Sequence, residues 1–166
     1  MKIIIMAALT AFLLIGCGEK ATTENVKPSL VVGNSLKELK INDQFGEEHG
    51  INMDTKKIIF AFAKDSAHIV NNFLVTKPST YLSENNVQFI ADVSGAPAII
   101  RSMFIMPGLK DFKHTVLIFE DEAVAAPFKV GSNETSIVFV GLENGKIVSV
   151  ENIAVTAESL PQIIEM

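Results

Sequence analysis

The chain has 166 residues, a formal net charge of −5 and 48% hydrophobic residues, the size and composition of one globular domain with a short additional segment. Its basic residues form no run or stripe, which disfavours nucleic acid as a partner. Cys17 is the only cysteine, so the sequence excludes an intrachain disulfide, a Cys-x-x-Cys redox pair and a cysteine-rich zinc site.

The first segment, residues 1–16, is typical of a secretory leader. Lys2 supplies a positive charge before the apolar stretch Ile3–Ile15, which has the length of a signal-peptide core and is short for a membrane span. The segment runs into the sequence LIGC, whose last residue is Cys17. This order of an aliphatic residue, a small or aliphatic residue, Gly and then Cys resembles the lipobox of bacterial lipoproteins.

The lipobox resemblance implies transfer of a diacylglyceryl group to Cys17 Sγ, cleavage after Gly16 and acylation of the new N-terminus. One acyl chain binds a membrane only marginally, whereas two or three anchor a protein stably. We therefore predict a bacterial cell-envelope protein that is lipid-anchored through Cys17 and faces the periplasm. Gly18 replaces the Asp that is associated with inner-membrane retention in enterobacterial lipoproteins, which favours the outer membrane. The alternative is an ordinary secretory or anchor segment with an incidental cysteine.

The residues after the lipobox have the composition of a tether. Residues 17–32 are rich in Gly, Ser, Thr, Lys, Glu and Asn, so we predict a lipidated Cys17 and a flexible tether there, followed by one domain over residues 33–166. The domain opens with turn residues over 42–46 between two short strand-like stretches, a pattern that predicts a β-hairpin.

The centre of the predicted fold is a strand followed by a helix. Ile58–Ala63 is a continuous apolar run, which suits a strand that is covered on both faces. The polar sequence Lys64-Asp65-Ser66 breaks the run, and either Asp65 or Ser66 is expected to cap a helix over residues 67–74.

Apolar runs then alternate with helical patterns, and Pro or Gly residues separate them. In chain order, the predicted elements are a short helix over 79–85, a strand over 87–93, a helix over 98–106 stopped by Pro107-Gly108, a strand over 115–119, two strands over 135–142 and 146–150 joined by the turn Glu143-Asn144-Gly145, and a final helix from Thr156 through Ile164. Met103 and Phe104 fit either an exposed contact surface or the end of a core helix, and the core helix is the favoured interpretation.

This order of elements predicts a mixed α/β sheet with helices on both faces. It resembles the thioredoxin fold of peroxiredoxin-like and TlpA-like proteins. Residues 58–74 take the place of the central strand and active-site helix, and residues 138–147 resemble the hairpin near the C-terminus of that fold. The resemblance implies a thioredoxin-like mixed sheet flanked by helices, with an N-terminal β-hairpin extension, over roughly residues 33–166.

Two departures remove the chemistry of that fold family. Its members carry Cys-x-x-Cys or a single peroxidatic Cys where this chain reads Lys64-Asp65-Ser66-Ala67-His68, and they carry a cis-proline where residues 133–136 contain no proline. A serine hydroxyl barely ionises near neutral pH, so Ser66 does not replace a thiolate. The sequence therefore excludes thiol redox chemistry, and we carry over no catalytic residue.

We predict a redox-inactive binding or assembly module whose partner is another envelope protein or a small ligand, without a cofactor or metal. The candidate contact surface comprises Asp65, Ser66, His68, Glu134 and Thr135. The alternative is a non-thiol enzyme that uses the helix mouth around Asp65, Ser66 and His68. Ser66 and His68 are two residues apart, a spacing that does not place both on one face of a helix, so the non-catalytic interpretation is favoured. A purely structural lipoprotein is the third interpretation.

Overall fold

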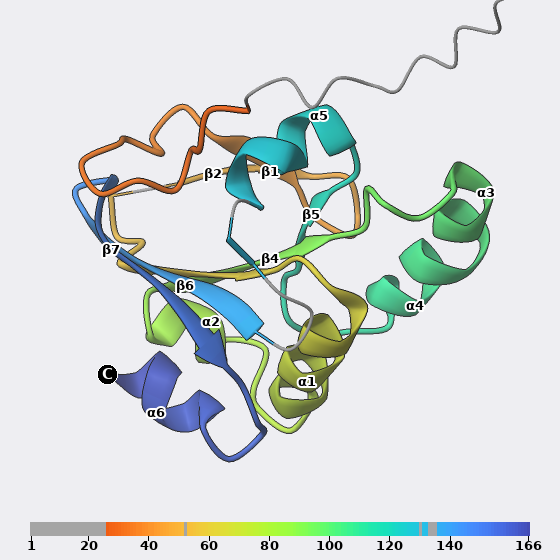
Figure 1. The fold of residues 1–166 in the computed structure, drawn as a ribbon. Coiled ribbons are helices and arrows are strands. Elements are labelled where there is room, and N and C mark those ends of the chain that lie inside the picture. Colours follow the sequence, from red (N-terminus) through yellow and green to blue (C-terminus); the bar gives the residue numbers. More distant parts are fainter. Residues whose placement is uncertain (1–25, 52, 130, 133–135) are drawn as a thin grey trace, which may run out of the picture.

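The computed structural model describes residues 26–51, 53–129, 131–132 and 136–166 (Figure 1). The predicted leader, the lipidation of Cys17 and most of the tether lie outside the described residues, as do the candidate contact residues Glu134 and Thr135. Among the described residues, no helix is both long and apolar enough to cross a membrane.

A five-stranded sheet forms the middle of the domain, in the order β5-β4-β3-β6-β7. Its strands are β3 (Lys57–Ala61), β4 (Val87–Asp92), β5 (Leu117–Phe119), β6 (Ser136–Glu143) and β7 (Lys146–Ala154). The strands β3, β4 and β5 are parallel, whereas β6 runs antiparallel to β3 and β7 antiparallel to β6. The sheet is therefore mixed, as the sequence predicts.

Helices cover both faces of this sheet. They are α1 (Lys64–Val75), α2 (Tyr81–Glu84), α3 (Ala98–Ile100), the π-helical turn η1 (Arg101–Ile105), α4 (Met106–Lys110), α5 (Glu122–Ala125), the 3-10 turn η2 (Ala126–Phe128) and α6 (Leu160–Glu165). Figure 1 shows α1, α2 and α6 below the sheet and α5 above it. The predicted α/β fold with a two-sided core is confirmed.

The central strand β3 joins two apolar layers. Ile59 packs into the layer of α1, α2 and α6, while Ile58 and Phe60 pack into the layer of α5 and η2. Successive side chains of a strand point to opposite faces, so the unbroken apolar run predicted a strand with a layer on each side. All three side chains are completely buried, which confirms that prediction.

The predicted N-terminal hairpin is present as β1 (Lys40–Asn42) and β2 (Glu48–Gly50), which pair antiparallel. Its turn is held by Asp43, whose Oδ1 accepts hydrogen bonds from the backbone N–H groups of Phe45 at 2.8 Å and Glu47 at 3.0 Å. Gly46 takes the positive φ of 86° that the turn requires. The hairpin thus forms because its turn residues satisfy one another locally.

Gln44 docks this hairpin onto the sheet. The side chain is buried, its Nε2 donates to the His114 carbonyl at 2.8 Å, and its Oε1 accepts from the Val116 N–H at 2.8 Å. The Val116 carbonyl also accepts from the Gln44 N–H at 3.1 Å, so both backbone groups of Val116 face the hairpin. Pairing with β4 begins at Leu117, and the strand is shorter than the predicted 115–119. The hairpin is therefore continuous with the edge of the sheet.

Two of the helix boundaries that differ from the sequence prediction lie at a proline. The helix predicted over 98–106 continues to Lys110 through η1, so Pro107-Gly108 does not stop it. The widened π turn lets α4 begin anew with Pro107 in its first turn, where the missing N–H is not needed. Likewise α6 begins at Leu160 rather than at Thr156, which places Pro161 in the first turn of that helix.

The turn Glu143-Asn144-Gly145 joins β6 to β7 as predicted. Asn144 and Gly145 have φ values of 50° and 74°, which is the left-handed geometry of a tight hairpin turn. The returning strand extends to Ala154, four residues beyond the predicted end at residue 150.

We expect the free energy of unfolding to fall as the pH drops from about 6.5 to about 4. His114 is buried beside Asn71 of α1, with His114 Nε2 and Asn71 Oδ1 separated by 2.9 Å, and burial lowers the pKa of His114 to about 4. Below pH 6.5 the unfolded chain binds a proton at this side chain that the folded protein does not bind until about pH 4. Stability is therefore complete above this window and decreases by up to about 3 kcal/mol within it.

Urea unfolding at a series of pH values measures this loss. His114→Gln keeps a polar partner for Asn71 but does not titrate, so it should flatten the pH dependence. His68→Gln is the matched control, because His68 is exposed and its removal should leave the slope of wild-type protein. An unchanged slope in His114→Gln would contradict the assignment.

Candidate functional site

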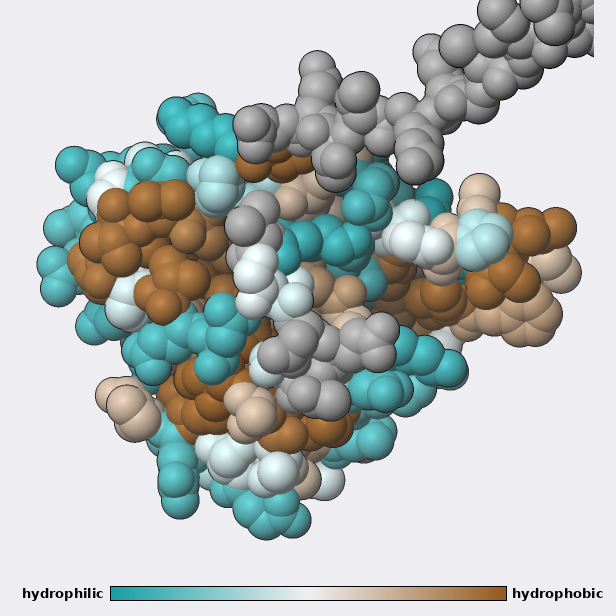
Figure 2. All heavy atoms as spheres, viewed as in Figure 1, coloured by the Kyte–Doolittle hydropathy of each residue, from teal (hydrophilic) through white to brown (hydrophobic). Residues whose placement is uncertain are grey.

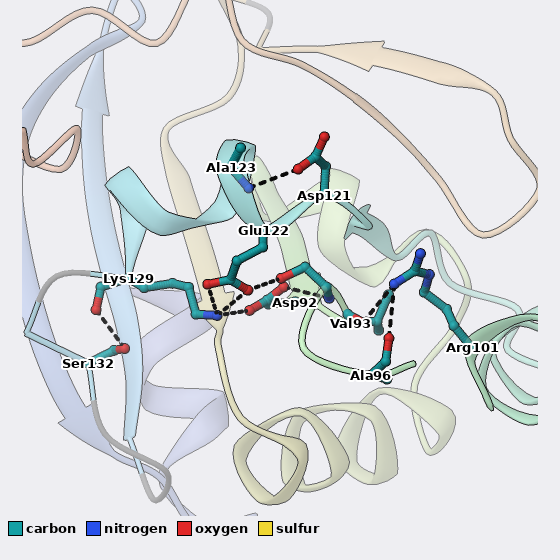
Figure 3. Close-up of polar contacts among 10 residues, drawn as sticks. Asp92, Val93, Ala96, Arg101, Asp121, Glu122, Ala123, Lys129 and Ser132 are labelled. Carbon is teal, nitrogen blue, oxygen red and sulfur yellow. Dashed lines mark hydrogen bonds and ion pairs between the residues drawn. The ribbon is translucent and has the colours of Figure 1, made fainter. Parts of the chain in front are cut away.

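The carboxyl ends of the parallel strands β3, β4 and β5 meet at one edge of the sheet, beside the N-terminus of α1. In open α/β sheets this edge is where ligands bind. Three polar stretches lie at these strand ends: the helix mouth Lys64–His68 after β3, Asp92 at the end of β4 with Ser94 after it, and Glu122 and Lys129 after β5. Figure 3 shows Asp92, Glu122 and Lys129 pointing toward one another. This edge is the candidate functional site.

The helix mouth is built differently from the sequence prediction. The chain enters α1 at Ala63, which has an extended backbone with φ −130° and ψ 153°, and no side chain caps the helix. Asp65 and Ser66 therefore lie within the first turn, and the prediction that one of them caps the helix is wrong. Asp65 is still well placed for the helix dipole, because a negative charge near a helix N-terminus is favourable.

Ser66 faces the interior of the protein. Its side chain is completely buried, and its Oγ donates a hydrogen bond to the Ala63 carbonyl at 3.0 Å. Asp65 and His68 are exposed on the other side of the helix. The structure therefore does not bring Ser66 together with Asp65 and His68 on one surface, which agrees with the expectation that Ser66 and His68 do not share a face.

A polar network next to the helix mouth was not predicted (Figure 3). Asp92 Oδ2 lies 2.8 Å from Lys129 Nζ, and Asp92 Oδ1 accepts a hydrogen bond from the Ser94 N–H at 2.9 Å. Lys129 Nζ also donates to Glu122 Oε2 at 3.1 Å, and Ser94 Oγ donates to the same oxygen at 2.7 Å. Loops from β4 and β5 are thereby tied together at the candidate site.

The side chains of this network differ in how far they are buried. The Asp92 side chain is 3% exposed and that of Lys129 28%, whereas that of Glu122 is 59% exposed. Burial by itself lowers the pKa of Lys129, but hydrogen bonds and charge attraction to Asp92 and Glu122 outweigh it and raise the pKa above its usual value. Lys129 therefore stays charged near neutral pH, and the carboxylate of Asp92 has a cation beside it.

Of the Asp92–Lys129 pair, only Asp92 could be identified from the sequence. Asp92 ends an apolar strand, and the carboxyl ends of neighbouring parallel strands meet, so Asp92 was identifiable as a residue of this edge. Lys129 follows a segment without a clear pattern, and nothing in the sequence connects it to Asp92. The pair depends on the packing of α5 and η2 over the sheet.

A second polar group lies in the N-terminal hairpin. Ligand atoms of Asp43, Glu47 and His49 lie within 4.8 Å of one another, close enough to hold a metal ion. Both oxygens of the buried Asp43 carboxylate are already used, because Oδ1 accepts two backbone N–H groups and Oδ2 lies 2.9 Å from His49 Nε2. Burial alone raises the pKa of Asp43, but these hydrogen bonds outweigh it and lower the pKa. The role of Asp43 in holding the hairpin turn is therefore enough to account for this cluster without a metal ion.

Two cavities among the described residues lie away from the helix mouth. One has a volume of about 430 Å³ and is lined by hairpin, α2 and β4 residues that include His49, Ser83 and Gln88. The other, of about 470 Å³, lies between residues 27–39 and Phe128. Neither cavity is lined by Asp65, Ser66 or His68.

The comparisons with known proteins bear on the fold. Neither a family model nor a curated protein sequence matches this chain. Among solved structures, the chain is similar to a Chlorobium tepidum protein described as a thiol:disulfide interchange protein DsbE, with a TM-score of 0.54 and 15% identity over 82% of this chain and 96% of that one.

Two further structures have the same architecture. The exposed lipoprotein thioredoxin Etrx1 of Streptococcus pneumoniae matches with a TM-score of 0.51 and 14% identity, over 76% of this chain and 97% of that one. Peroxidoxin BcpB of Mycobacterium tuberculosis matches with a TM-score of 0.50 and 13% identity, over 80% and 93%. The fold is thioredoxin-like. Identities this low show the fold and not the activity.

The helix mouth occupies the position at which the thioredoxin fold is expected to carry its redox cysteines. The predicted resemblance places the redox cysteines of that fold at the start of α1, where this chain has Lys64–His68. The chain's one cysteine, Cys17, lies far from this position in the sequence. The absence of a thiol from the helix mouth therefore agrees with a thioredoxin-like domain that lacks the redox cysteines.

We expect Lys129→Met to lower the free energy of unfolding by about 3 kcal/mol, because it leaves the buried Asp92 carboxylate without its cation. Glu122→Gln is the matched control, and its effect should stay within about 0.5 kcal/mol, because the Glu122 carboxylate is largely exposed. The double variant Asp92→Asn/Lys129→Met should recover most of the loss. Urea unfolding measures all three, and equal costs for Lys129→Met and Glu122→Gln would contradict the assignment.

Proposed function

We propose that this chain is a lipid-anchored protein of the bacterial cell envelope whose thioredoxin-like domain works as a binding or assembly module without thiol chemistry. The observation that carries the proposal is the helix mouth. It holds no cysteine, and the one hydroxyl in its first turn, that of Ser66, is buried and donates to the Ala63 carbonyl. A domain of this fold with such a mouth presents neither a thiol nor an accessible hydroxyl to a substrate.

The rival function is a non-thiol enzyme that uses Asp65, Ser66 and His68. General base catalysis needs a base within hydrogen-bond reach of the group that it deprotonates. Ser66 faces the interior while Asp65 and His68 face solvent, which argues against this arrangement. The partly buried ion pair of Asp92 and Lys129 is already hydrogen-bonded within the protein.

The proposed location rests on the leader sequence. The lipobox places Cys17 where lipid attachment requires it, and Gly18 favours the outer membrane. A similar fold occurs in Etrx1 of Streptococcus pneumoniae, which is described as an exposed lipoprotein. The anchor would hold the module at the membrane surface, where its partner is another envelope protein or a small ligand.

The anchor is tested by Cys17→Ser. Serine has no thiol to accept the diacylglyceryl group, so the variant should incorporate no labelled fatty acid and should keep its leader uncleaved by the lipoprotein pathway. Metabolic labelling with radioactive palmitate and immunoprecipitation measures both effects. Acyl labelling of the serine variant at the wild-type level would disprove anchoring at Cys17.

The module is tested by alanine substitution of Asp65, Ser66, His68 and Glu134 in a strain that lacks the native protein. We expect each variant either to restore the phenotype of the wild-type protein or to lose its partner together with the phenotype, because in a binding module these side chains contact the partner and perform no chemistry. Ser66→Ala should lower stability by about 1 kcal/mol through its lost hydrogen bond, so unfolding is measured alongside. In vivo cross-linking of the wild-type protein should capture a reproducible envelope partner. If the partner is instead a small ligand, that molecule should purify together with the protein.

Two results would count against the module. A stably folded alanine variant that fails to restore the phenotype while still capturing its partner would support the enzyme. A wild-type protein with no reproducible partner or ligand would support the purely structural interpretation.

A further inference from the structure

Four large apolar side chains project from the segment between β4 and β5. Ile99, Ile100, Met103 and Phe104 are 65%, 42%, 60% and 66% exposed, respectively. The sequence favoured a core helix for Met103 and Phe104, and the structure shows that this interpretation is wrong. Figure 2 shows hydrophobic side chains gathered on the projection formed by α3 and α4 at the right of the molecule. We call these four residues the apolar ridge.

The ridge is held in place by contacts behind it. Ile105, Met106 and Leu109 pack against the core, and they are the residues that attach the segment to the sheet. Arg101 adds polar contacts, because its Nη1 donates to the Ala96 carbonyl at 3.1 Å and its Nε lies 3.7 Å from Glu120 Oε2. The segment is thus attached on one side, and its apolar side chains face away from the protein.

The segment is also basic in an acidic protein. Residues 98–113 contain Arg101, Lys110 and Lys113 against the single acid Asp111, a net charge of +2, whereas the whole chain carries −5. Arg101 is turned inward toward Glu120, so Lys110 and Lys113 are the exposed cations of the segment. Exposed apolar side chains and exposed lysines on one helical segment are features of a helix that lies in a membrane interface. Anionic lipid headgroups attract such basic residues by roughly 1 kcal/mol for each one near the surface.

We propose that the apolar ridge inserts into the headgroup boundary of an anionic lipid bilayer and so fixes the orientation of the domain on its membrane. This inference rests on the proposed lipid anchor for its cellular setting. Ridge insertion itself requires only an anionic bilayer and the described segment. The occupant is a lipid surface because its two chemistries, acyl chains and anionic headgroups, match the apolar ridge and the exposed Lys110 and Lys113 of the same segment.

The predicted tether keeps the ridge close to such a surface. Ser29 is the first described residue whose backbone bonds to the body of the domain, with its N–H donating to the Pro127 carbonyl at 2.8 Å. Twelve residues separate Ser29 from Cys17, a span of about 40 Å when fully extended and about 20 Å as a coil. At these distances a weak insertion is strengthened by the high effective concentration of the bilayer.

The test uses the chain from residue 17 with Cys17→Ser, which keeps every described residue and carries no lipid. The sequence has no tryptophan, so a single Trp reports its own surroundings. Phe104→Trp places the reporter on the ridge, and Phe45→Trp is the matched control, because Phe45 is 59% exposed on the hairpin turn. Each variant is titrated with vesicles of phosphatidylglycerol and of phosphatidylcholine.

We expect the emission of Phe104→Trp to shift to shorter wavelength and to be quenched by brominated acyl chains in phosphatidylglycerol vesicles, with a much weaker response in phosphatidylcholine. The Phe45→Trp control should not respond to either. Adding Ile99→Ser to Phe104→Trp should weaken vesicle binding about tenfold, the effect of removing one large apolar contact. Circular dichroism confirms that each variant is folded.

Three results would overturn the proposal. The first is no response of Phe104→Trp to anionic vesicles, and the second is an equal response of Phe45→Trp. The third is a blue shift that depends on protein concentration without lipid, together with a dimer in ultracentrifugation, which would assign the ridge to a second copy of the chain. Because the protein in this test carries no lipid, failure of the anchor proposal at Cys17 and failure of ridge insertion are separate outcomes.

Discussion

The structure depends on covering β3 from both sides. Ile58, Ile59, Phe60 and Ala61 are all completely buried, so neither face of the strand tolerates water. A strand of this kind is stable only between two apolar layers. The layer of α1, α2 and α6 follows directly from the alternation of strands and helices, and it would form in any α/β domain of this order. The opposite layer requires more, because α5 and η2 are short.

The N-terminal hairpin supplies what those short helices lack. Its Ile41 lies in the same apolar layer as Phe60 and Phe128, and Gln44 bonds both to the carbonyl of His114 and to the N–H of Val116. A buried amide that satisfies two backbone groups in this way joins the hairpin to the residues just before β5. The hairpin is therefore a part of the core.

The sequence predicted the elements whose signals lie in consecutive residues. The apolar run of β3 and the Asn144-Gly145 turn are of this kind, because burial on two faces and a left-handed turn each impose a local composition. Helix ends were harder to predict. Ser66 has the chemistry of a cap, but the chain enters α1 earlier at Ala63, and Pro107 has the chemistry of a stop, but a π turn lets a new helix start around it. In both cases the path of the backbone, and not the type of residue, set where the helix begins or ends.

The ion pair at the candidate site could not be predicted from the sequence, and the loop beside it also contacts the segment that bears the apolar ridge. Asp92 meets Lys129 only because η2 packs over the sheet, and no local pattern encodes that contact. The loop that follows Asp92 carries the two carbonyls, of Val93 and Ala96, to which Arg101 donates. One loop therefore links the ion pair at the site to the segment that bears the apolar ridge. This segment connects β4 to β5, and its Ile105, Met106, Leu109 and Phe112 pack against the core. The four apolar side chains that face outward are not needed for that role, so an interaction outside the domain is the reason that accounts for them.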